Sequence, residues 1–484
     1  MSNRETRKTS ETVNRLTNGI ILLGAFFGFL AVAFSATRIL ELFGTGVSLT
    51  FYFGTSILGL TTSIVFLTCL RLAQEFKRNI LLMVFSISIP VLCVESYLSI
   101  VPRSSDANAV GLSIMGDQRS KIQVIDDLNV DGITAYPNLS GSMFLETNGI
   151  PGQSGSQEIL PIGSISNTKS VYCNESGYWT IFHSDEHGFN NPLNNYISGQ
   201  VDVMLTGDSF TEGACVKPKE TIAAILRKTG LRVISLGKGG NGTLLEYASF
   251  VEYIKPIQPK IVIWMHYAND LRDLSHKELR SSILRGYLED EEYSQGLIFR
   301  QKEIDAALTR FIGEKYVEQK ATLALPAPTR NGSDRPVDDE RPSDRFAGIS
   351  IIEILKLTRL RELIGLRPGR PDPVLETATV FRLLLQRAKE STAKWGGRLY
   401  LAYLPQYERY QTGRDHDVFY KDFVLRTAST LEIPIIDIHK EVFKSHPDPL
   451  SLFPQRKARH YNARGYKLTA GAIHGRLLDD AVFR

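Results

Sequence analysis

Long apolar runs separated by polar flanks dominate the N-terminal part of the chain. The runs cover residues 19–36, 47–70 and 80–101. Each approaches or exceeds the roughly 20 residues that a helix needs to cross a bilayer. The first run lacks a small-residue cleavage site and is closely followed by the second, so a removed signal peptide is not expected. The pattern predicts a membrane anchor with three transmembrane helices over residues 1–101.

Basic residues in the short flanks predict the orientation of this anchor. They concentrate in the N-terminal tail and between the second and third runs, whereas the loop between the first and second runs holds only Arg38. The basic residues are Arg4, Arg7, Lys8 and Arg15 in the tail, and Arg71, Lys77 and Arg78 in the later loop. Because basic loops stay cytoplasmic, we expect a cytoplasmic N-terminus and an extracytoplasmic remainder. In a bacterium this is an inner-membrane protein with a periplasmic domain, and the bilayer is its first partner.

Short apolar segments alternate with amphipathic ones from residue 201 onward. Segments 201–206, 232–236, 260–265, 398–403 and 433–438 are predicted strands. Helices are expected near residues 219–228, 244–254, 376–394 and 416–430, and a last helix from Ala463. Strands that alternate with helices predict an α/β fold, in which a parallel sheet is covered by helices on both faces as a three-layer sandwich.

Two stretches depart from this alternation. Residues 102–200 are mixed and rich in Gly, Ser and Asn, with short stretches such as 122–125 that we expect to be extended. They predict an extracytoplasmic lead-in that packs on the main domain, residues 201–484. That domain is interrupted by an insertion at about 271–374, and the Pro-, Asp- and Arg-rich middle of the insertion, 325–345, is expected to be mobile or to form a lid.

Composition excludes some classes of function. The net charge of +4 is small for 484 residues and does not indicate a nucleic-acid partner. The chain has no zinc-ligand spacing and no phosphate-binding loop motif, so neither a metal nor a cofactor is expected. Cys69 and Cys93 lie in apolar runs, where thiols are ordinarily packed. Cys173 and Cys215 lie in the soluble part, where they form either a disulfide, if the compartment is oxidising, or two free thiols.

Residues that could take part in catalysis follow successive predicted strands. Gly207-Asp208-Ser209 follows the first strand, the glycine-rich run 237–242 follows the second, and Asn269 follows the third. His460 precedes the last predicted helix. Functional groups of parallel sheets gather at the carboxyl ends of the strands. A serine on such a turn is suited to nucleophilic attack, and backbone N–H groups and an amide are suited to stabilise an oxyanion.

The run 237–242 also fits the GxGxxG pattern of dinucleotide sites. It lies between a predicted strand and a predicted helix, as that motif requires. The next strand ends in Met265-His266, however, without the acid that would bind a ribose. The dinucleotide interpretation is therefore the weaker of the two.

The ordered set of motifs resembles the SGNH (GDSL) hydrolase superfamily over about residues 200–275 and 395–480. The resemblance implies a flavodoxin-like fold with Ser209 as nucleophile and His460 as base. It also implies an oxyanion hole made by the backbone N–H groups of Ser209 and Gly240 and the side chain of Asn269. The stretch 184–192 resembles bacterial membrane-linked SGNH proteins of surface-polysaccharide loci, a group of O-acetylesterase and O-acetyltransferase type.

Two residues depart from the family pattern. Tyr267 stands where the third motif has a glycine, and Lys457 stands three residues before His460, where the family has an aspartate. A lysine cannot accept the imidazole N–H as a carboxylate does. Either a Ser–His dyad operates, with a backbone carbonyl orienting the ring, or another acid takes the role. Asp448 is near in sequence but has no geometric support at this level.

The resemblance implies a function in acyl chemistry. We expect ester hydrolysis or acetyl transfer on an extracytoplasmic carbohydrate, through an acyl-enzyme on Ser209. The partners are then an acylated or acceptor polysaccharide and, for a transferase, a separate membrane protein that supplies the acyl group. One alternative is a catalytically degenerate carbohydrate-binding or assembly protein of a polysaccharide system. A phospholipid or thioester hydrolase is another.

Overall fold

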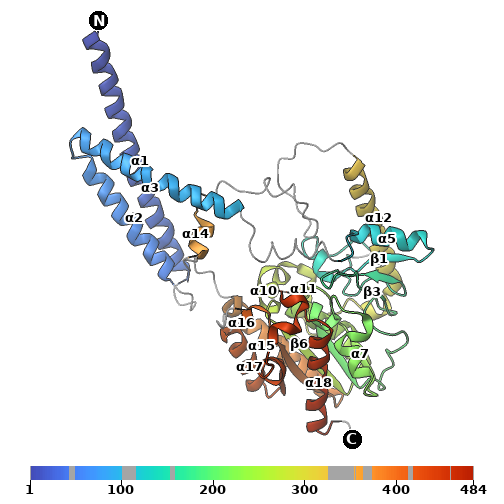
Figure 1. The fold of residues 1–484 in the computed structure, drawn as a ribbon. Coiled ribbons are helices and arrows are strands. Elements are labelled where there is room, and N and C mark those ends of the chain that lie inside the picture. The colour runs from blue at the N-terminus through green and yellow to red at the C-terminus, as the bar shows by residue number, and fades with distance from the viewer. Residues whose placement is uncertain are drawn as a thin grey trace. The chain divides into compact units, whose positions relative to one another are not determined.

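Two compact units make up the chain in the computed structural model (Figure 1). One unit comprises Met1–Ser104 and Pro328–Leu375, and the other comprises Ser105–Ala327 and Glu376–Arg484. The described residues are 2–42, 49–100, 116–152, 158–324, 354, 356–363, 373–411, 418–457 and 459–482.

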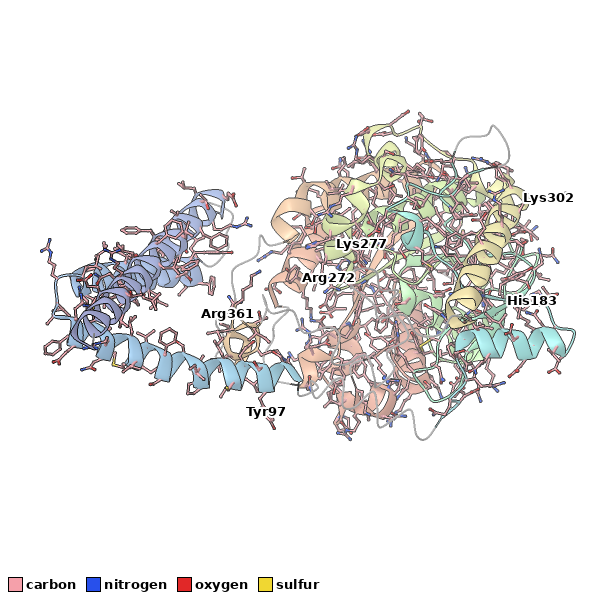
Figure 2. The ribbon with its side chains drawn as sticks, turned by 90° about the horizontal axis from the view of Figure 1, so that it is seen from above. Tyr97, His183, Arg272, Lys277, Lys302 and Arg361 are labelled. Atoms are coloured by element: carbon pink, nitrogen blue, oxygen red, sulfur yellow. A yellow bond between two sulfur atoms is a disulfide. The ribbon has the colours of Figure 1, made fainter. Side chains whose placement is uncertain are left out.

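Three long helices form most of the first unit. They are α1 (Ser2–Leu42), α2 (Thr50–Cys69) and α3 (Gln74–Ile100). Each is long and apolar enough to cross a membrane, which confirms the three apolar helices predicted from the sequence. Figure 2 shows the side chains that project around them, and large apolar ones such as Phe27 and Phe85 are about half exposed. Such surfaces are typical of helices surrounded by lipid.

Small residues bring α1 and α2 close together. A Cβ atom added at Gly28 would lie 2.6 Å from the carbonyl oxygen of Gly59. The Ser63 hydroxyl donates a hydrogen bond to the carbonyl oxygen of Ala25 at 3.0 Å. Close backbone approach and hydrogen bonds between helices are the contacts that hold apolar helices together where burial of apolar surface gives no advantage.

Glu95 is a fully buried carboxyl residue in α3. Its two oxygens accept the backbone N–H groups of Arg359 and Leu360, each at 2.7 Å. These N–H groups belong to the first turn of α14 (Thr358–Leu363), where a helix has no partners of its own for them. The contact stabilises both the buried carboxyl and the start of α14, and it joins this part of the insertion to the apolar helix α3.

The second unit contains the predicted parallel sheet. Its strands are β4 (Val203–Gly207), β5 (Val233–Ser235), β6 (Ile261–Tyr267), β7 (Arg398–Leu404) and β8 (Ile435–Asp437). They are all parallel, in the spatial order β5-β4-β6-β7-β8. Every predicted strand is therefore present within three residues of its expected ends.

Helices cover both faces of this sheet, as predicted. Val203 and Leu205 of β4 share one core with α7 (Ile222–Arg227) and α18 (Ala463–Asp479). Thr206 points to the opposite face, where its hydroxyl donates to the carbonyl oxygen of Glu246 in α8 (Thr243–Ser249) at 2.9 Å. Further helices of this C-terminal half are α15 (Pro373–Lys394), α16 (Glu408–Gln411) and α17 (Val418–Thr430). The three-layer α/β architecture is confirmed.

The lead-in differs from its expected irregular form. Residues 122–125, expected to be extended, lie in α5 (Lys121–Val130). Ser120 caps this helix through a reciprocal pair of hydrogen bonds with Gln123, and such a capping box outweighs the strand preference of a short Ile/Val run. The lead-in also forms a small sheet of β1 (Ala135–Pro137), β2 (Lys169–Val171) and β3 (Ile181–His183).

Part of the predicted insertion folds onto the second unit. It contains α10 (Asp270–His276), α11 (Ser282–Glu289) and α12 (Gln301–Ala324). Glu278 from this region accepts the backbone N–H groups of Gly242, Leu244 and Leu245, and so caps the start of α8. The stretch 325–345, predicted to be mobile or a lid, lies outside the described residues.

Candidate active site

Three loops meet beside the carboxyl end of strand β4. β4 lies between β5 and β6 in the sheet, and all three strands run in the same direction. Ser209 follows β4, the run 237–242 follows β5, and Asn269 follows β6. The sheet topology alone therefore brings the serine, the glycine run and the amide to one edge, as the sequence predicted.

Ser209 begins the short helix α6 (Ser209–Glu212). The carboxyl of Asp208 caps that helix by accepting the Phe210 N–H at 2.9 Å. Gly237 permits the tight packing behind the turn, because a Cβ atom there would lie 2.2 Å from the backbone nitrogen of Glu212. The turn is therefore fixed on both sides, and the Ser209 side chain is only partly buried.

His460 lies within hydrogen-bond distance of this serine. Its Nε2 is 2.8 Å from Ser209 Oγ. The histidine directly precedes α18, whose N-cap Asn462 accepts the N–H groups of Arg464 and Gly465 at 3.0 Å each. A base at this distance can take the hydroxyl proton during nucleophilic attack.

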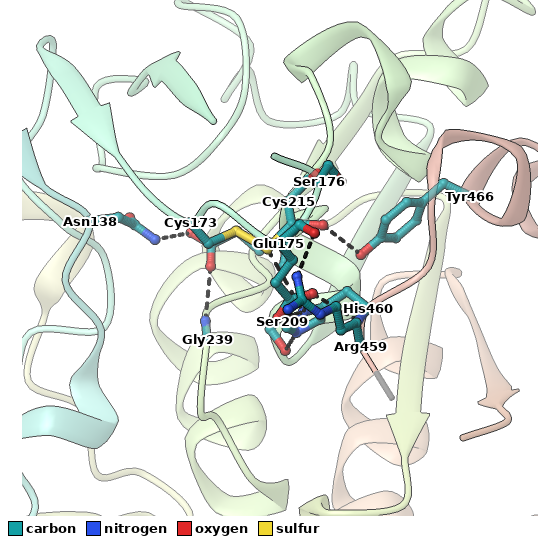
Figure 3. Close-up of a disulfide and its surroundings, with 12 residues drawn as sticks. Asn138, Cys173, Glu175, Ser176, Ser209, Cys215, Gly239, Arg459, His460 and Tyr466 are labelled. Atoms are coloured by element: carbon teal, nitrogen blue, oxygen red, sulfur yellow. Dashed lines mark hydrogen bonds and ion pairs between the residues drawn. A yellow bond between two sulfur atoms is a disulfide. The ribbon is translucent and has the colours of Figure 1, made fainter. Parts of the chain in front are cut away.

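Glu175 is a carboxyl residue in contact with the other side of His460. His460 Nδ1 is 3.0 Å from both carboxylate oxygens of Glu175, and the His460 backbone N–H donates to one of them at 3.1 Å. Figure 3 shows Glu175, His460 and Ser209 in this arrangement. Asp448 instead forms a bidentate pair with Arg456 at 2.7 and 2.8 Å. The sequence left two alternatives, a Ser–His dyad or a different acid from the family's aspartate, whose position Lys457 occupies. The contact between Glu175 and His460 corresponds to the second.

The carboxylate of Glu175 and the imidazolium of His460 each stabilise the charged form of the other. Burial disfavours a charged imidazole, but the Glu175 carboxylate outweighs burial and raises the pKa of His460 above its ordinary value. Burial also opposes the charge of Glu175, and the interactions with His460 and Arg459 outweigh it and lower the pKa of Glu175. Glu175 is thus ionised where His460 titrates, and it can stabilise an imidazolium during reaction.

Asp208 is a second carboxyl residue near Ser209. One of its oxygens lies 3.4 Å from Ser209 Oγ, which is longer than the contact with His460. Burial, and after it the neighbouring Asp270, raise the pKa of Asp208 to about 8. Asp208 contributes less than Glu175 to the raised pKa of His460, so Glu175 is the main charged partner of the histidine.

Gly240 offers one backbone N–H in the glycine-rich run. The neighbouring N–H groups bond within the protein: Lys238 to Gly207, Gly239 to Glu212, and Asn241 to Lys238. Among the described residues, none accepts the Gly240 N–H. A φ of +77° at this position favours glycine, and a Cβ atom there would lie 2.6 Å from Ser142 Oγ. A single donor suits an oxyanion, whereas a pyrophosphate requires several.

A fully buried ion pair fixes the backbone beside Gly240. Lys238 Nζ lies 2.9 Å from Glu212 Oε1, and both side chains have no exposed surface. Asn138 from the lead-in bonds to both of them, at 2.6 and 2.9 Å. The second Glu212 oxygen accepts the Gly239 N–H at 2.9 Å. The charges are thus satisfied, and the run is anchored to α6, the helix that carries both Ser209 and Glu212.

Asn269 presents its side-chain amide from the start of α10. Nδ2 donates one hydrogen to Asp273 Oδ2 at 2.9 Å, and Asp273 also pairs with Lys277, labelled in Figure 2, at 3.0 Å. An amide nitrogen carries two hydrogens, so a second remains for a substrate oxygen. Asp273 therefore orients the amide without using all of its donors.

Replacing Asn269 with alanine is expected to lower kcat on an acetyl ester by about 100-fold, the usual effect of losing one oxyanion donor. The KM should change little, because the interaction forms in the transition state. Steady-state kinetics with p-nitrophenyl acetate measure both constants. An unchanged kcat would exclude Asn269 from the oxyanion hole.

Cys173 and Cys215 form a disulfide in the structure. It lies next to the His460–Glu175 pair, with Cys215 Sγ 4.0 Å from His460 Nδ1 (Figure 3). The atoms of Glu175, Cys215 and His460 are close enough to suggest a metal site. Because Cys215 Sγ is bonded to Cys173, it cannot act as a thiolate ligand, and two ligands remain in this group.

Glu175 was not found from the sequence because it lies 34 residues before Ser209, outside the family motifs. The available signal was the pair Cys173–Cys215. A disulfide between them would bring any residue near Cys173 close to the turn that follows Ser209. The carboxyl two residues after Cys173 is the candidate that this reasoning selects.

The chain was also compared with known proteins. No protein-family model matches it, and no curated protein matches its sequence. Among solved structures, it is similar to a member of the lipolytic G-D-S-L family from Veillonella parvula, with 13% identity and a TM-score of 0.30 over 57% of this chain and 97% of the other. It is also similar to a lipase/acylhydrolase from Enterococcus faecalis, with 11% identity and a TM-score of 0.30 over 58% of this chain and 96% of the other. An acetylxylan esterase from Geobacillus stearothermophilus is similar with 14% identity and a TM-score of 0.28, over 57% of this chain and 93% of the other. Similarity at this level leaves the chemistry to be derived from the residues of the chain itself.

Proposed function

We propose that the protein is a membrane-anchored serine hydrolase or acyltransferase that acts on acyl esters of an extracytoplasmic carbohydrate. The observation that carries the proposal is the chain of contacts from Ser209 Oγ through His460 to the Glu175 carboxylate. Such a chain activates a hydroxyl that is otherwise a weak nucleophile. The adjacent donors of Ser209, Gly240 and Asn269 support the same reaction.

The proposed reaction has two acyl-transfer steps. Ser209 Oγ attacks the ester carbonyl while its proton passes to His460 Nε2, and Glu175 stabilises the resulting imidazolium. The N–H groups of Ser209 and Gly240 and the Asn269 amide hold the negative oxygen. Collapse releases the alcohol, which takes the proton from His460, and leaves an acyl group on Ser209. His460 then takes a proton from the second acceptor, whose oxygen attacks the acyl carbonyl. The bond to Ser209 Oγ breaks, and the proton passes from His460 back to the serine oxygen.

The identity of the second acceptor distinguishes the two activities. Water gives hydrolysis, and a sugar hydroxyl gives O-acylation. The basic flanks of the apolar helices support a domain on the extracytoplasmic side, where exported polysaccharide is the accessible ester or acceptor. Three helices are few for carrying an acyl group across a bilayer, so a transferase would receive it from a separate membrane protein.

A serine-reactive fluorophosphonate tests the proposed active site. The full-length protein in membranes or detergent is expected to be labelled, and Ser209→Ala or His460→Ala should abolish labelling. His474→Ala, on α18, is the matched control and should leave labelling unchanged. Absence of labelling in folded wild-type protein would overturn the proposal and favour a non-catalytic carbohydrate-binding or assembly protein.

A further inference from the structure

The three residues of the proposed triad come from separate parts of the second unit. Ser209 follows β4 of the five-stranded sheet, and His460 precedes α18, which packs in the core on one face of that sheet. Glu175 lies in the loop between β2 and β3, which belong to the small sheet of the lead-in. No strand pairs between the two sheets among the described residues. The position of the acid therefore depends on contacts between loops.

The β2–β3 loop is closed at its base and held near its tip. The Thr180 N–H donates to the carbonyl oxygen of Cys173 at 2.8 Å, which closes the base. Nearer the tip, the Ser176 hydroxyl donates to the carbonyl oxygen of Cys215 at 2.9 Å. The disulfide joins Cys173 to the same Cys215, with the Cα atoms 5.3 Å apart. Covalent bond and hydrogen bond thus connect the same two segments on either side of Glu175.

Cys215 belongs to the turn that ends the nucleophile helix. Directly before it, the Ala214 N–H donates to the carbonyl oxygen of Ser209 at 2.9 Å. Cys215 is 1% exposed, and its sulfur lies 4.0 Å from His460 Nδ1, the atom that Glu175 contacts. The disulfide therefore links the loop of the acid to the turn of the nucleophile, right beside the base.

We propose that the Cys173–Cys215 disulfide is a positioning element of the active site, which holds the Glu175 carboxylate within hydrogen-bond distance of His460. This inference rests on the proposed function and goes beyond it. Without the bond, the loop keeps the Ser176 contact and the contact of Arg459 with the Glu175 carbonyl oxygen, so it loosens without detaching. A displacement of about 1 Å at a catalytic group typically costs about 100-fold in rate.

The proposal links activity to the compartment in which the domain folds. Disulfides persist in oxidising compartments and are rare where glutathione and thioredoxin keep thiols reduced. A chain without the bond has its nucleophile and base in place but a poorly held acid. Full activity is therefore reached only after the domain has been exported and oxidised.

The test is the double substitution Cys173→Ala/Cys215→Ala in the full-length protein. Both cysteines are replaced because a remaining Cys215 thiolate would itself act on His460. The rate constant of fluorophosphonate labelling is measured against pH. We expect labelling to slow by about 10-fold to 100-fold. We also expect its acid limb to move to lower pH, since an imidazole that loses a carboxylate is harder to protonate.

The same double substitution is then made in a Glu175→Gln background. With the carboxylate already absent, removing the disulfide should cause no further loss of labelling rate. The comparison cancels any general effect of the disulfide on stability, because both backgrounds lose the same bond. Cys69→Ala/Cys93→Ala, in the membrane helices, is the control for cysteine removal and should change neither rate nor pH profile.

The outcomes separate the two proposals. An equal loss in both backgrounds, or no loss in either, overturns the positioning role while leaving the active site in place. A wild-type protein that is not labelled overturns the proposed function itself. If this double variant does not fold, Cys173→Ser/Cys215→Ser replaces it in both backgrounds. A loss of labelling rate with Glu175 present, and none with Glu175→Gln, supports the inference, and any other result overturns it.

Discussion

Replacing Ser209 with alanine should remove ester hydrolysis, with a loss of about 10⁴-fold or more in kcat on a small acetyl ester. In the proposed reaction the hydroxyl oxygen forms the acyl-enzyme, so neither His460 nor the oxyanion donors can compensate for its loss. The side chain is small and only partly buried, and the thermal unfolding temperature is expected to stay the same. Hydrolysis of p-nitrophenyl acetate and circular dichroism measure the two properties.

Ser275→Ala is the matched control for this variant. The Ser275 hydroxyl donates to the carbonyl oxygen of Arg272 in α10, and its loss should leave kcat unchanged. In cells, the acetyl content of the surface glycan should change in the Ser209→Ala strain, in a direction that separates the activities. Loss of acetyl groups indicates a transferase, and their accumulation indicates an esterase. Unchanged glycan in that strain would contradict a catalytic role.

Replacing Glu175 with glutamine should lower kcat by about 10³-fold, since a neutral amide no longer stabilises the imidazolium or fixes its tautomer. The substitution also changes the pH dependence. The carboxylate raises the pKa of His460, and the base acts only when neutral, so wild-type activity falls as the pH drops below that raised value. In Glu175→Gln the pKa of His460 falls, and the acid limb of kcat/KM moves to lower pH. The pH profile on an acetyl ester measures this shift.

Two further variants show whether the effect belongs to the carboxylate at this position. Glu175→Asp keeps the charge on a shorter side chain, and we expect it to recover part of the rate and of the wild-type pH profile. Asp448→Asn removes the acid that is nearer in sequence, but Asp448 pairs with Arg456, so activity should not change. A rate loss in Asp448→Asn with none in Glu175→Gln would refute the assignment of the acid.

The alternation of apolar and polar positions was sufficient for the main architecture. The strands of the sheet are apolar because they are buried on both faces. Each strand can therefore be predicted from its own short run of apolar residues. Each of the three N-terminal apolar helices can likewise be predicted from its own sequence, over a longer apolar run. Local errors arose where a short signal was ambiguous, as at 122–125, where the Ser120 cap decided for a helix.

The candidate site was accessible to the sequence only in part. Ser209, Gly240 and Asn269 follow consecutive strands, and parallel strands that pair bring their carboxyl ends together. His460 could be predicted as the base from the family resemblance and from its position just before the last helix. The capping of α8 by Glu278 and the burial of Lys238 with Glu212 join residues that share no motif and no regular spacing, so they became visible only in three dimensions.

By itself, the sequence determined the apolar helices, the parallel sheet, and a serine and histidine at the places where such a sheet presents them. These features follow from periodicity and from the order of strands, which are local properties of the chain. Only the tertiary structure decided which acid faces His460. Glu175 reaches it from a separate small sheet, through a loop joined to the nucleophile turn by the Cys173–Cys215 disulfide. Contacts of this kind depend on how two independently hydrogen-bonded sheets pack, and no spacing along the chain encodes that packing.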